Sequence, residues 1–182
     1  MHKIAPRRRQ PSAATSTRPS RPHLSATYLV RGAWGADAAE IHELVAHHAE
    51  AGLVLPRSAE EIAAAVDDYV VVTDRHGRVL ACAALLEYSP SLGEVSSVVV
   101  SPDAQGQGLG SMAVRGVEAM ARRRSIDELF AVTLADGFFH SLGYERCAIA
   151  RYPEKLARYE ALQARGVQVV PKSCFRKLAS WE

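Results

Sequence analysis

Apolar residues recur at two spacings along this 182-residue chain, and the two spacings predict a regular series of strands and helices. Short runs rich in β-branched residues and bounded by turn residues predict strands. The expected strands are residues 27–33, 69–73, 78–88, 94–101, 127–134, 144–152 and 173–178. Apolar residues three and four positions apart predict helices, which we expect at residues 36–52, 57–66, 107–123, 136–143 and 153–166. Ser58 and Glu61 form a capping-box pattern at the start of the second helix.

The order of these elements predicts the fold class. Two helices precede a meander of three strands, and strands alternate with helices after the meander. Such an order predicts a single α/β domain of the α+β kind, in which helices cover both faces of a mixed, mostly antiparallel sheet. We place this domain at residues 27–182.

The first 26 residues differ from the rest in composition. They contain six Lys and Arg residues, four prolines and no acidic residue, which predicts a disordered basic tail. An organelle-targeting peptide is the alternative interpretation, although the prolines disfavour the amphipathic helix of such peptides. Of the 22 basic residues, 16 remain in residues 27–182 against 20 acidic ones. This acidic excess argues against nucleic acid as a partner of the domain.

The apolar runs and the cysteines bound the remaining possibilities. No apolar run is long enough to cross a bilayer, so we expect no membrane partner. Cys82, Cys147 and Cys174 lie far apart and form no C-x-x-C motif, so we expect neither a disulfide framework nor a metal site. A reducing cytoplasm is therefore the default location. We interpret Cys82, which lies in an apolar strand without a local base, as a packing residue rather than a nucleophile.

A glycine-rich segment joins the strand at 94–101 to the helix at 107–123. Gly106, Gly108 and Gly110 alternate within the sequence QGQGLGS, residues 105–111. The first amides of a helix lack partners and carry partial positive charge, so a bare backbone there can gather around a phosphate. One tight turn, the structural alternative, rarely needs three glycines. The segment lacks the Lys of a nucleotide-triphosphate loop, and unlike a dinucleotide fingerprint it does not follow its strand directly.

The sequence Q-G-Q-G-L-G at residues 105–110 resembles the Q/R-x-x-G-x-G/A motif of the GNAT superfamily of N-acetyltransferases. The element order and the segment FFHSLGY at 138–144 are similar too. The resemblance implies a splayed pair of central strands, with acetyl-CoA as the co-substrate. The loop amides would hold its pyrophosphate, and free backbone groups of the strand would pair with its pantetheine arm. The residues that would bind acetyl-CoA are Val98, Val99, Val100, Gln105, Gly106, Gln107, Gly108, Leu109, Gly110 and Ser111.

Several segments are similar to the acetyltransferase domain of N-acetylglutamate synthase in particular. They include AGLVLPRSAEEI at 51–62, GEVSSVVVSPDAQGQGLGSM at 93–112 and YPEKLARY at 152–159. This similarity implies that acetyl passes to the α-amine of an amino acid, with glutamate as the expected acceptor, by direct attack in a ternary complex. In that enzyme the reaction is the first step of arginine biosynthesis. A homodimer is compatible with the sequence.

The same similarity assigns roles to three residues. Arg57 matches a residue that holds a substrate carboxylate, which suits a guanidinium; a solvated arginine before a helix is the alternative. Glu94 matches the proposed general base for the attacking amine; a surface glutamate after a turn is the alternative. Thr133 matches a hydroxyl proposed to protonate the leaving thiolate, although threonine is also common in strands. A second carboxylate contact could come from Arg151, Lys155 or Lys172, and the spacing does not choose among them.

The chain departs from the synthase pattern after Thr133, where LADG is one residue shorter and lacks the usual second Thr. This difference leaves a peptide terminus, a polyamine or an aminoglycoside-like antibiotic open as the acceptor. Phe139 stands where many GNAT enzymes carry a Tyr acid, as it does in the synthase. A catalytically silent acyl-CoA-binding module is a third hypothesis. Feedback by arginine and the purpose of the tail cannot be read from the sequence.

Overall fold

The structure is a computed structural model that describes residues 28–178, so the tail predicted at 1–26 lies outside the described residues. Within them, seven strands form one sheet in the order β1-β2-β3-β4-β5-β7-β6. The strands are β1 (Leu29–Gly32), β2 (Tyr69–Thr73), β3 (Val79–Ser89), β4 (Leu92–Val100), β5 (Glu128–Thr133), β6 (Glu145–Cys147) and β7 (Ser173–Leu178). Neighbouring strands are antiparallel except β4 and β5, which are parallel. The predicted mixed, mostly antiparallel sheet is confirmed.

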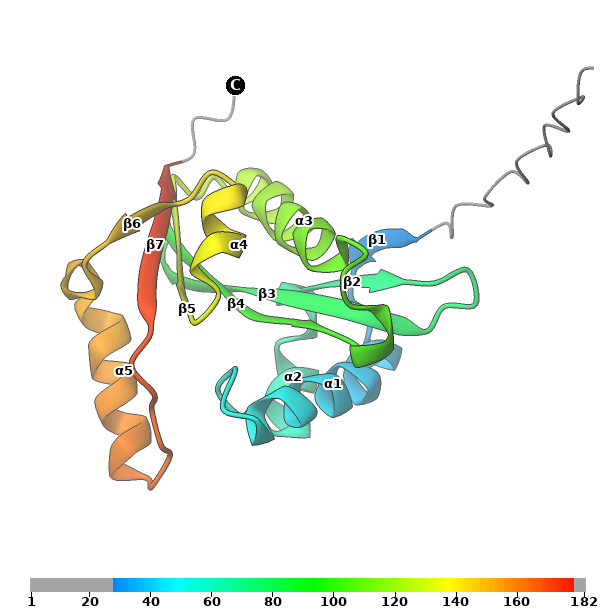
Figure 1. Cartoon of the computed structure of the whole chain (residues 1–182), viewed down its shortest axis with the longest axis horizontal. Helices are drawn as coiled ribbons and strands as arrows, with labels where there is room; N and C mark the ends of the chain where they lie inside the picture. Colours follow the sequence, from blue (N-terminus) through cyan, green and yellow to red (C-terminus); the bar gives the residue numbers. More distant parts are fainter. Residues whose placement is uncertain (1–27, 179–182) are drawn as a thin grey trace, which may run out of the picture.

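Helices cover both faces of this sheet, as predicted (Figure 1). The helices α3 (Leu109–Arg123) and α4 (Asp136–Ser141) lie on one face, and α1 (Ala38–Glu50) and α2 (Ala59–Ala64) lie on the other. The fifth helix, α5 (Pro153–Ala164), runs beside β7 near the end of the sheet. Among the described residues, no helix combines the length and the apolar character that a membrane span requires.

The alternation of side chains along β3 divides the core between the two helical layers. Ala81, Ala83 and Leu85 belong to the apolar cluster beneath α3, whereas Cys82 and Ala84 belong to the cluster beneath α1. Successive side chains of a strand point to opposite faces, so a strand with apolar residues at every position is buried on both sides. The central strands therefore form a rigid base for the residues that they carry.

Close packing fixes the position of α3 on the sheet. Gly116 faces β2, and a Cβ atom there would lie 2.5 Å from Val70 Cγ1 and 3.2 Å from Val30 Cγ1. A larger residue would push the helix away, because neither valine has room to move in a closely packed core. The glycine thus sets where the N-terminus of α3 meets the glycine loop.

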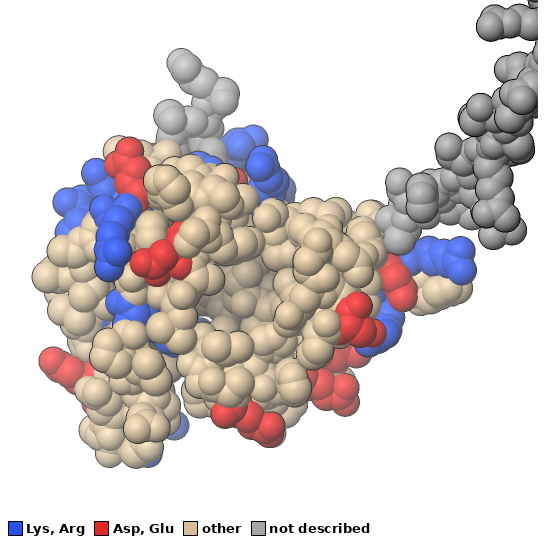
Figure 2. All heavy atoms as spheres, in the orientation of Figure 1, with Lys and Arg blue, Asp and Glu red and all other residues tan. Residues whose placement is uncertain are grey.

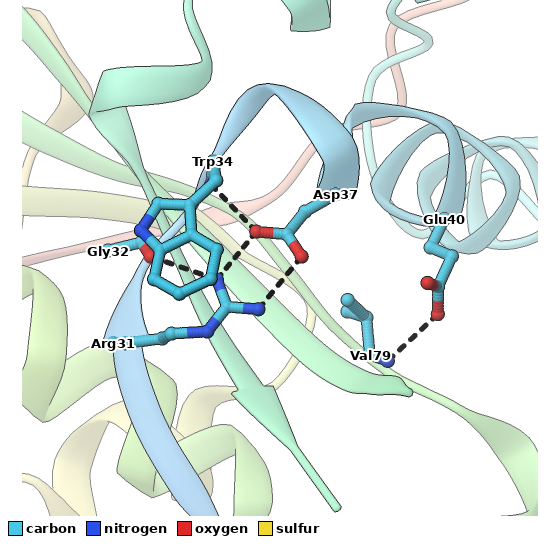
Figure 3. A network of polar contacts seen from close by, with 6 residues as sticks. All are labelled: Arg31, Gly32, Trp34, Asp37, Glu40 and Val79. Carbon is cyan, nitrogen blue, oxygen red and sulfur yellow. Dashed lines mark hydrogen bonds and ion pairs between the residues drawn. The ribbon is translucent and has the colours of Figure 1, made fainter. Parts of the chain in front are cut away.

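A polar cluster around Arg31 ties β1 to the start of α1 (Figure 3). The Arg31 guanidinium donates to both carboxylate oxygens of Asp37, with Nη1–Oδ2 at 2.6 Å and Nη2–Oδ1 at 2.9 Å. Its Cζ lies 4.1 Å from the centre of the Trp34 ring. The backbone N–H of Trp34 donates to Asp37 Oδ2 at 2.7 Å. The hydrogen bond from Arg31 is the largest cause that lowers the pKa of Asp37. In the same view, Glu40 of α1 accepts a hydrogen bond from the N–H of Val79 at 2.9 Å.

Most predicted elements are confirmed within a few residues. Ser58 and Glu61 form both hydrogen bonds of the capping box at the start of α2. The strand expected at 144–152 is wrong in extent, because β6 ends at Cys147 and a 3-10 turn occupies 149–151. Tyr152, at the end of this segment, instead packs its buried ring on Phe130 of β5, with 3.9 Å between the ring centroids.

Arg124, the residue that follows α3, forms two ion pairs. Arg124 Nη1 lies 2.6 Å from Asp68 Oδ1 and 2.7 Å from Glu87 Oε1. Arg124 therefore connects α3 to β3 and to the segment before β2.

Candidate active site

The two parallel strands β4 and β5 begin side by side and then separate. Their register pairs Leu92–Glu94 with Glu128–Phe130, and within the described residues no pairing between them continues beyond Glu94. On its opposite edge, β5 pairs with β7 along its whole length. The edge of β4 that faces β5 is therefore open from Val95 to Val100, and the predicted splay of the central strands is confirmed.

An irregularity within β4 changes which side chains face each layer. The pairing with β3 skips Ser97 and Val98, and Ser97 has φ 51°, a left-handed conformation that non-glycine residues rarely adopt. Val95 packs beneath α3, whereas Val99 packs beneath α1. Because neighbours alternate along a strand, Glu94 faces the α1–α2 side of the sheet.

The glycine loop lies between the end of β4 and the start of α3. Gly106 and Gly108 have φ of 75° and 79°, and a Cβ on either would meet nothing within 4 Å. Both residues are thus glycine because of their backbone conformation, and the space above them is open. Gly110 lies in the first turn of α3 against β4, and a Cβ there would make an ordinary van der Waals contact, 3.4 Å from Val100 Cγ2.

The polar side chains of the loop are engaged by the protein itself. Gln105 Nε2 donates to the carbonyl of Val100 at 3.4 Å, and the Tyr28 hydroxyl donates to Gln107 Oε1. Leu109 is buried and Ser111 is half-buried. What the loop presents to solvent is therefore mainly the backbone around Gly106 and Gly108, together with the free N-terminus of a 15-residue helix.

A pocket opens beside the separated strands. Its polar lining includes Arg57, Glu94, Ser96, Ser97, Thr133, Lys155, Tyr159 and Lys172, and Val98 and Phe139 contribute to its apolar lining. Figure 2 shows a hollow in this face between the α5–β7 side and the side that carries α1 and α3. The structure thus brings together the residues predicted from separate segments. Arg151 is not among the lining residues, and its half-exposed side chain lies 3.9 Å from Glu128.

Glu94 is buried in this pocket, with 3% of its side chain exposed. Its Oε1 lies 2.6 Å from Lys155 Nζ, and its Oε2 accepts a hydrogen bond from the Tyr88 hydroxyl at 2.9 Å. The alternative interpretation of Glu94 as a surface residue is therefore wrong. A buried carboxylate needs such partners, because an unpaired charge away from water is costly.

Lys155 is the principal residue whose position the sequence did not reveal. Its side chain is 4% exposed, and its Nζ also lies 4.8 Å from the centre of the Tyr159 ring. Burial lowers the pKa of Lys155, although the charge of Glu94 acts in the opposite direction. The sequence did hold one signal: a lysine in the first turn of a helix opposes the helix dipole and therefore suggests a specific partner.

Lys172 and Thr133 complete the polar side of the pocket. Burial lowers the pKa of Lys172, and the nearby charge of Lys155 lowers it further. The Thr133 Oγ1 accepts a hydrogen bond from the N–H of Ala135 at 2.9 Å. The hydroxyl hydrogen of Thr133 remains able to donate. Ser96 Oγ is buried and has no hydrogen-bond partner among the described residues.

The cysteines give one confirmation and one proximity that their spacing did not predict. Cys82 is fully buried, and burial raises the pKa of its thiol to about 12, as expected of a packing residue. Cys147 and Cys174, which lie 27 positions apart in the sequence, are partners in the β6–β7 register with their sulfur atoms 3.5 Å apart. Within residues 28–178, no group of three or more His, Cys, Asp and Glu side chains is arranged to hold a metal ion.

Comparison with known proteins identifies the family to which this geometry belongs. Residues 36–144 match the Acetyltransferase (GNAT) family. The chain belongs to this family. An uncharacterised N-acetyltransferase of Chlorobaculum tepidum is 33% identical over 134 residues, which cover 74% of this chain and 86% of the relative. The protein is thus an N-acetyltransferase of the GNAT type.

A second group of relatives is named for amino-acid acetylation. An amino-acid acetyltransferase of Pasteurella multocida is 28% identical over 138 residues. The match covers 75% of this GNAT chain and 31% of the relative, so the chain spans less than a third of that protein's length.

Solved structures show the same fold. A Mycobacterium tuberculosis protein in complex with CoA and NLQ superposes with a TM-score of 0.72 at 24% identity, and the match covers 82% of this chain and 98% of that chain. The N-acetylglutamate synthase of Neisseria gonorrhoeae, complexed with coenzyme A and N-acetyl-glutamate, has the same TM-score and identity. That match covers 84% of this chain and 35% of the synthase.

Proposed function

We propose that this GNAT enzyme transfers the acetyl group of acetyl-CoA to the α-amine of an acidic amino acid, with glutamate as the preferred acceptor. The observation that carries the proposal is the set of charges around the pocket. Arg57, Lys155 and Lys172 are cationic, whereas Glu94 is the one acidic side chain among the described lining residues. Glutamate with a neutral α-amine carries two carboxylates, which match the excess of positive charge.

Two sites for carboxylates follow from this distribution. Arg57 lies before α2 and can grip a carboxylate with two parallel hydrogen bonds. Lys155 and Lys172 come from α5 and from the segment before β7, so they can hold a second carboxylate together. Arg151 is excluded from this role by its position outside the pocket lining. The amine between the two carboxylates would then lie near Glu94.

Acetyl-CoA fits the open edge of β4 and the loop that follows it. The edge from Val95 to Val100 can receive the amide groups of the pantetheine arm as an added strand would. The loop backbone at Gly106 and Gly108 is open to a pyrophosphate at the N-terminus of α3. About six residues of extended chain separate Glu94 from Val100, or about 20 Å. A long arm anchored at the loop would therefore bring its thioester to the pocket.

The chemistry then requires few protein groups. The neutral amine attacks the thioester carbonyl, a C–N bond forms and the C–S bond breaks. Glu94 accepts the proton that the amine loses, directly or through water. Backbone N–H groups near the irregularity at Ser97 and Val98 are candidates to polarise the carbonyl oxygen. Thr133 can donate a hydrogen bond to the departing thiolate.

An acceptor screen tests the proposal. Transfer of radiolabelled acetyl is measured for glutamate, aspartate, glutamine, polyamines and short peptides. We expect glutamate to have the highest kcat/KM, and transfer to polyamines or peptides without transfer to any amino acid would overturn the proposal. Arg57→Met should raise the KM for glutamate by at least about tenfold through loss of a charge-assisted contact. Arg151→Met, which removes an arginine outside the pocket, is the matched control and should leave the KM unchanged.

A further inference from the structure

Lys155 forms an ion pair with Glu94, the residue that would act as the general base. Lys155 Nζ lies 2.6 Å from Glu94 Oε1, and both side chains are at least 96% removed from solvent. The other carboxylate oxygen accepts a hydrogen bond from Tyr88. A proton delivered to Glu94 would end the ion pair and leave the Lys155 ammonium buried without a counter-charge. Such a loss is costly in a buried site, so the carboxylate is a poor proton acceptor while Lys155 remains bound to it.

Among residues 28–178, the groups around Lys155 include no anion besides Glu94. Tyr159 presents the face of its ring, and Arg57, Arg158 and Lys172 are cationic neighbours. Among the described residues that line the pocket, Glu94 is the one carboxylate. An acceptor that brings its own carboxylate into the pocket would therefore compete with Glu94 for the Lys155 ammonium.

We propose that Lys155 is a positioning residue that makes acetyl transfer depend on a carboxylate in the acceptor side chain. Before the acceptor binds, Lys155 neutralises Glu94. The acceptor carboxylate then draws the ammonium away from Oε1, and the freed carboxylate takes the proton of the attacking amine. This inference rests on the proposed function and adds a selectivity mechanism to it. An amine without the carboxylate would still bind, but it would leave the base paired.

In this mechanism, acceptors with and without a side-chain carboxylate differ mainly in kcat, because Glu94 must be released from Lys155 before it can accept the proton in the chemical step. Because Lys155 exchanges the Glu94 carboxylate for that of the acceptor, this contact adds little net affinity. A lysine whose main role is to hold the acceptor would instead change KM. A lysine with a purely structural role would, on removal, lower kcat for every acceptor. The behaviour of an acceptor without the side-chain carboxylate therefore separates the three roles.

Glutamate and glutamine provide the direct test, since they share the α-amine and nearly the same shape. Wild-type kcat should be at least about 10²-fold higher for glutamate, which is the low end of one general-base contribution. In Lys155→Met, kcat for glutamine should rise and the ratio of the two kcat values should approach one. Lys155→Arg, which preserves the ion pair, should keep most of the ratio. Lys172→Met is the control: it should raise the KM for glutamate without raising kcat for glutamine.

A second measurement uses the wild-type protein and therefore does not depend on a variant that folds. Alanine and acetate together reproduce the atoms of glutamate, with one carbon–carbon bond missing. Added acetate should increase kcat for alanine in the wild type, and should not do so in Lys155→Met. Sodium chloride at the same ionic strength controls for salt.

The outcomes distinguish this inference from the function on which it rests. Transfer to neither glutamate nor glutamine would overturn both. Transfer to glutamate, with a glutamine kcat that falls in Lys155→Met and no effect of acetate on alanine, would overturn the inference alone. A rise in the glutamine kcat of Lys155→Met, or activation of alanine by acetate, would support it.

Discussion

Glu94 lies opposite Phe130 at the last position where β4 and β5 pair. The Phe130 ring is fully buried and stacks on the Tyr152 ring. The centroid of the Tyr88 ring lies 5.5 Å from that of Phe130, in a tilted arrangement. Tyr88 also donates the hydrogen bond to Glu94 Oε2. The aromatic cluster at the point of strand separation therefore supports the carboxylate as well. The position of the candidate base is set by core packing rather than by a loop.

Substitution of the candidate base should have a large effect on the rate. In Glu94→Gln, kcat/KM for the acceptor should fall by about 10² to 10⁴, because general-base assistance contributes that range. Steady-state kinetics with glutamate measure the change, and calorimetry should find acetyl-CoA binding within about twofold of the wild type, or about 0.4 kcal/mol.

Glu128→Gln is the matched control for this change. Glu128 accepts a hydrogen bond from the Tyr152 hydroxyl at 2.6 Å, but it does not line the pocket. Its substitution should lower stability and leave kcat/KM nearly unchanged. Unchanged turnover in Glu94→Gln would contradict the assignment of Glu94 as the general base, whereas CoA binding without turnover in the wild type would favour the silent acyl-CoA-binding module.

The fold was largely predictable from the sequence, because the periodicity of apolar residues reflects the faces that each element buries. The order of the predicted strands and helices indicated the fold class, and the glycines that follow the strand at 94–101 provided the family motif. What periodicity cannot give is register. The irregularity at Ser97 and Val98, which lets Val95 and Val99 face opposite layers, depends on the pairing with β3 and leaves no local pattern.

The pocket was predicted only in part, because motif similarity identifies residues but not their long-range contacts. Arg57, Glu94 and Thr133 were found through similarity to known motifs, and the structure brings them to one pocket. The pairing of Lys155 with Glu94 spans 61 positions, and a single lysine in an amphipathic helix looks like a solvated residue. Contacts at this sequence separation come from tertiary packing. They cannot be read from spacing.

The cluster at Arg31 predicts a stability effect with a defined pH dependence. Arg31→Met should lower the free energy of unfolding by about 2 kcal/mol, since it leaves a nearly buried Asp37 without its guanidinium. The pKa of Asp37 is lowered from 3.8, so this contribution is present above that value and is lost as the pH falls through the lowered pKa. The difference between wild type and variant in urea unfolding should therefore shrink at acidic pH.

A solvent-exposed pair of the same type provides the comparison. Arg78 lies 3.1 Å from Asp103, but their side chains are 56% and 60% exposed. Arg78→Met should change stability by less than about 0.5 kcal/mol, because water screens such pairs. Equal losses in the two variants would contradict a special role for the Arg31 cluster.

The two neighbouring thiols predict selective oxidation. Paired residues on adjacent strands have Cα atoms about 4.5 to 5.5 Å apart, within the range that a disulfide spans. Diamide, which takes up two electrons and two protons, should convert Cys147 and Cys174 into a disulfide in the folded protein. Peptide mass spectrometry without reduction should find the linked peptides lighter by two hydrogen atoms.

Cys82 serves as the internal control for that experiment. The pKa of its thiol is raised to about 12 by burial, so it remains protonated at pH 8 to 9, where an ordinary thiol ionises. Cys82 should therefore resist both diamide and iodoacetamide until the protein unfolds. Labelling of Cys82 at the same rate as Cys147 would refute the interpretation of a closed core at this strand.

Gly108 allows the role of the glycine loop to be separated from its backbone strain. Gly108 in the loop and Gly77 in the β2–β3 turn have φ of 79° and 86°, and a Cβ on either would meet nothing within 4 Å. Substitution of either glycine by Ala should therefore lower the free energy of unfolding by a similar amount, about 1 kcal/mol, because alanine is strained in the left-handed conformation. If the loop backbone holds the pyrophosphate of acetyl-CoA, Gly108→Ala should also raise the Kd for CoA by at least about tenfold, or 1.4 kcal/mol. Gly77→Ala should leave that Kd unchanged, and calorimetric titration of both variants at matched stability measures the difference. Equal affinities in the two variants would show that the open space above the loop does not receive the carrier.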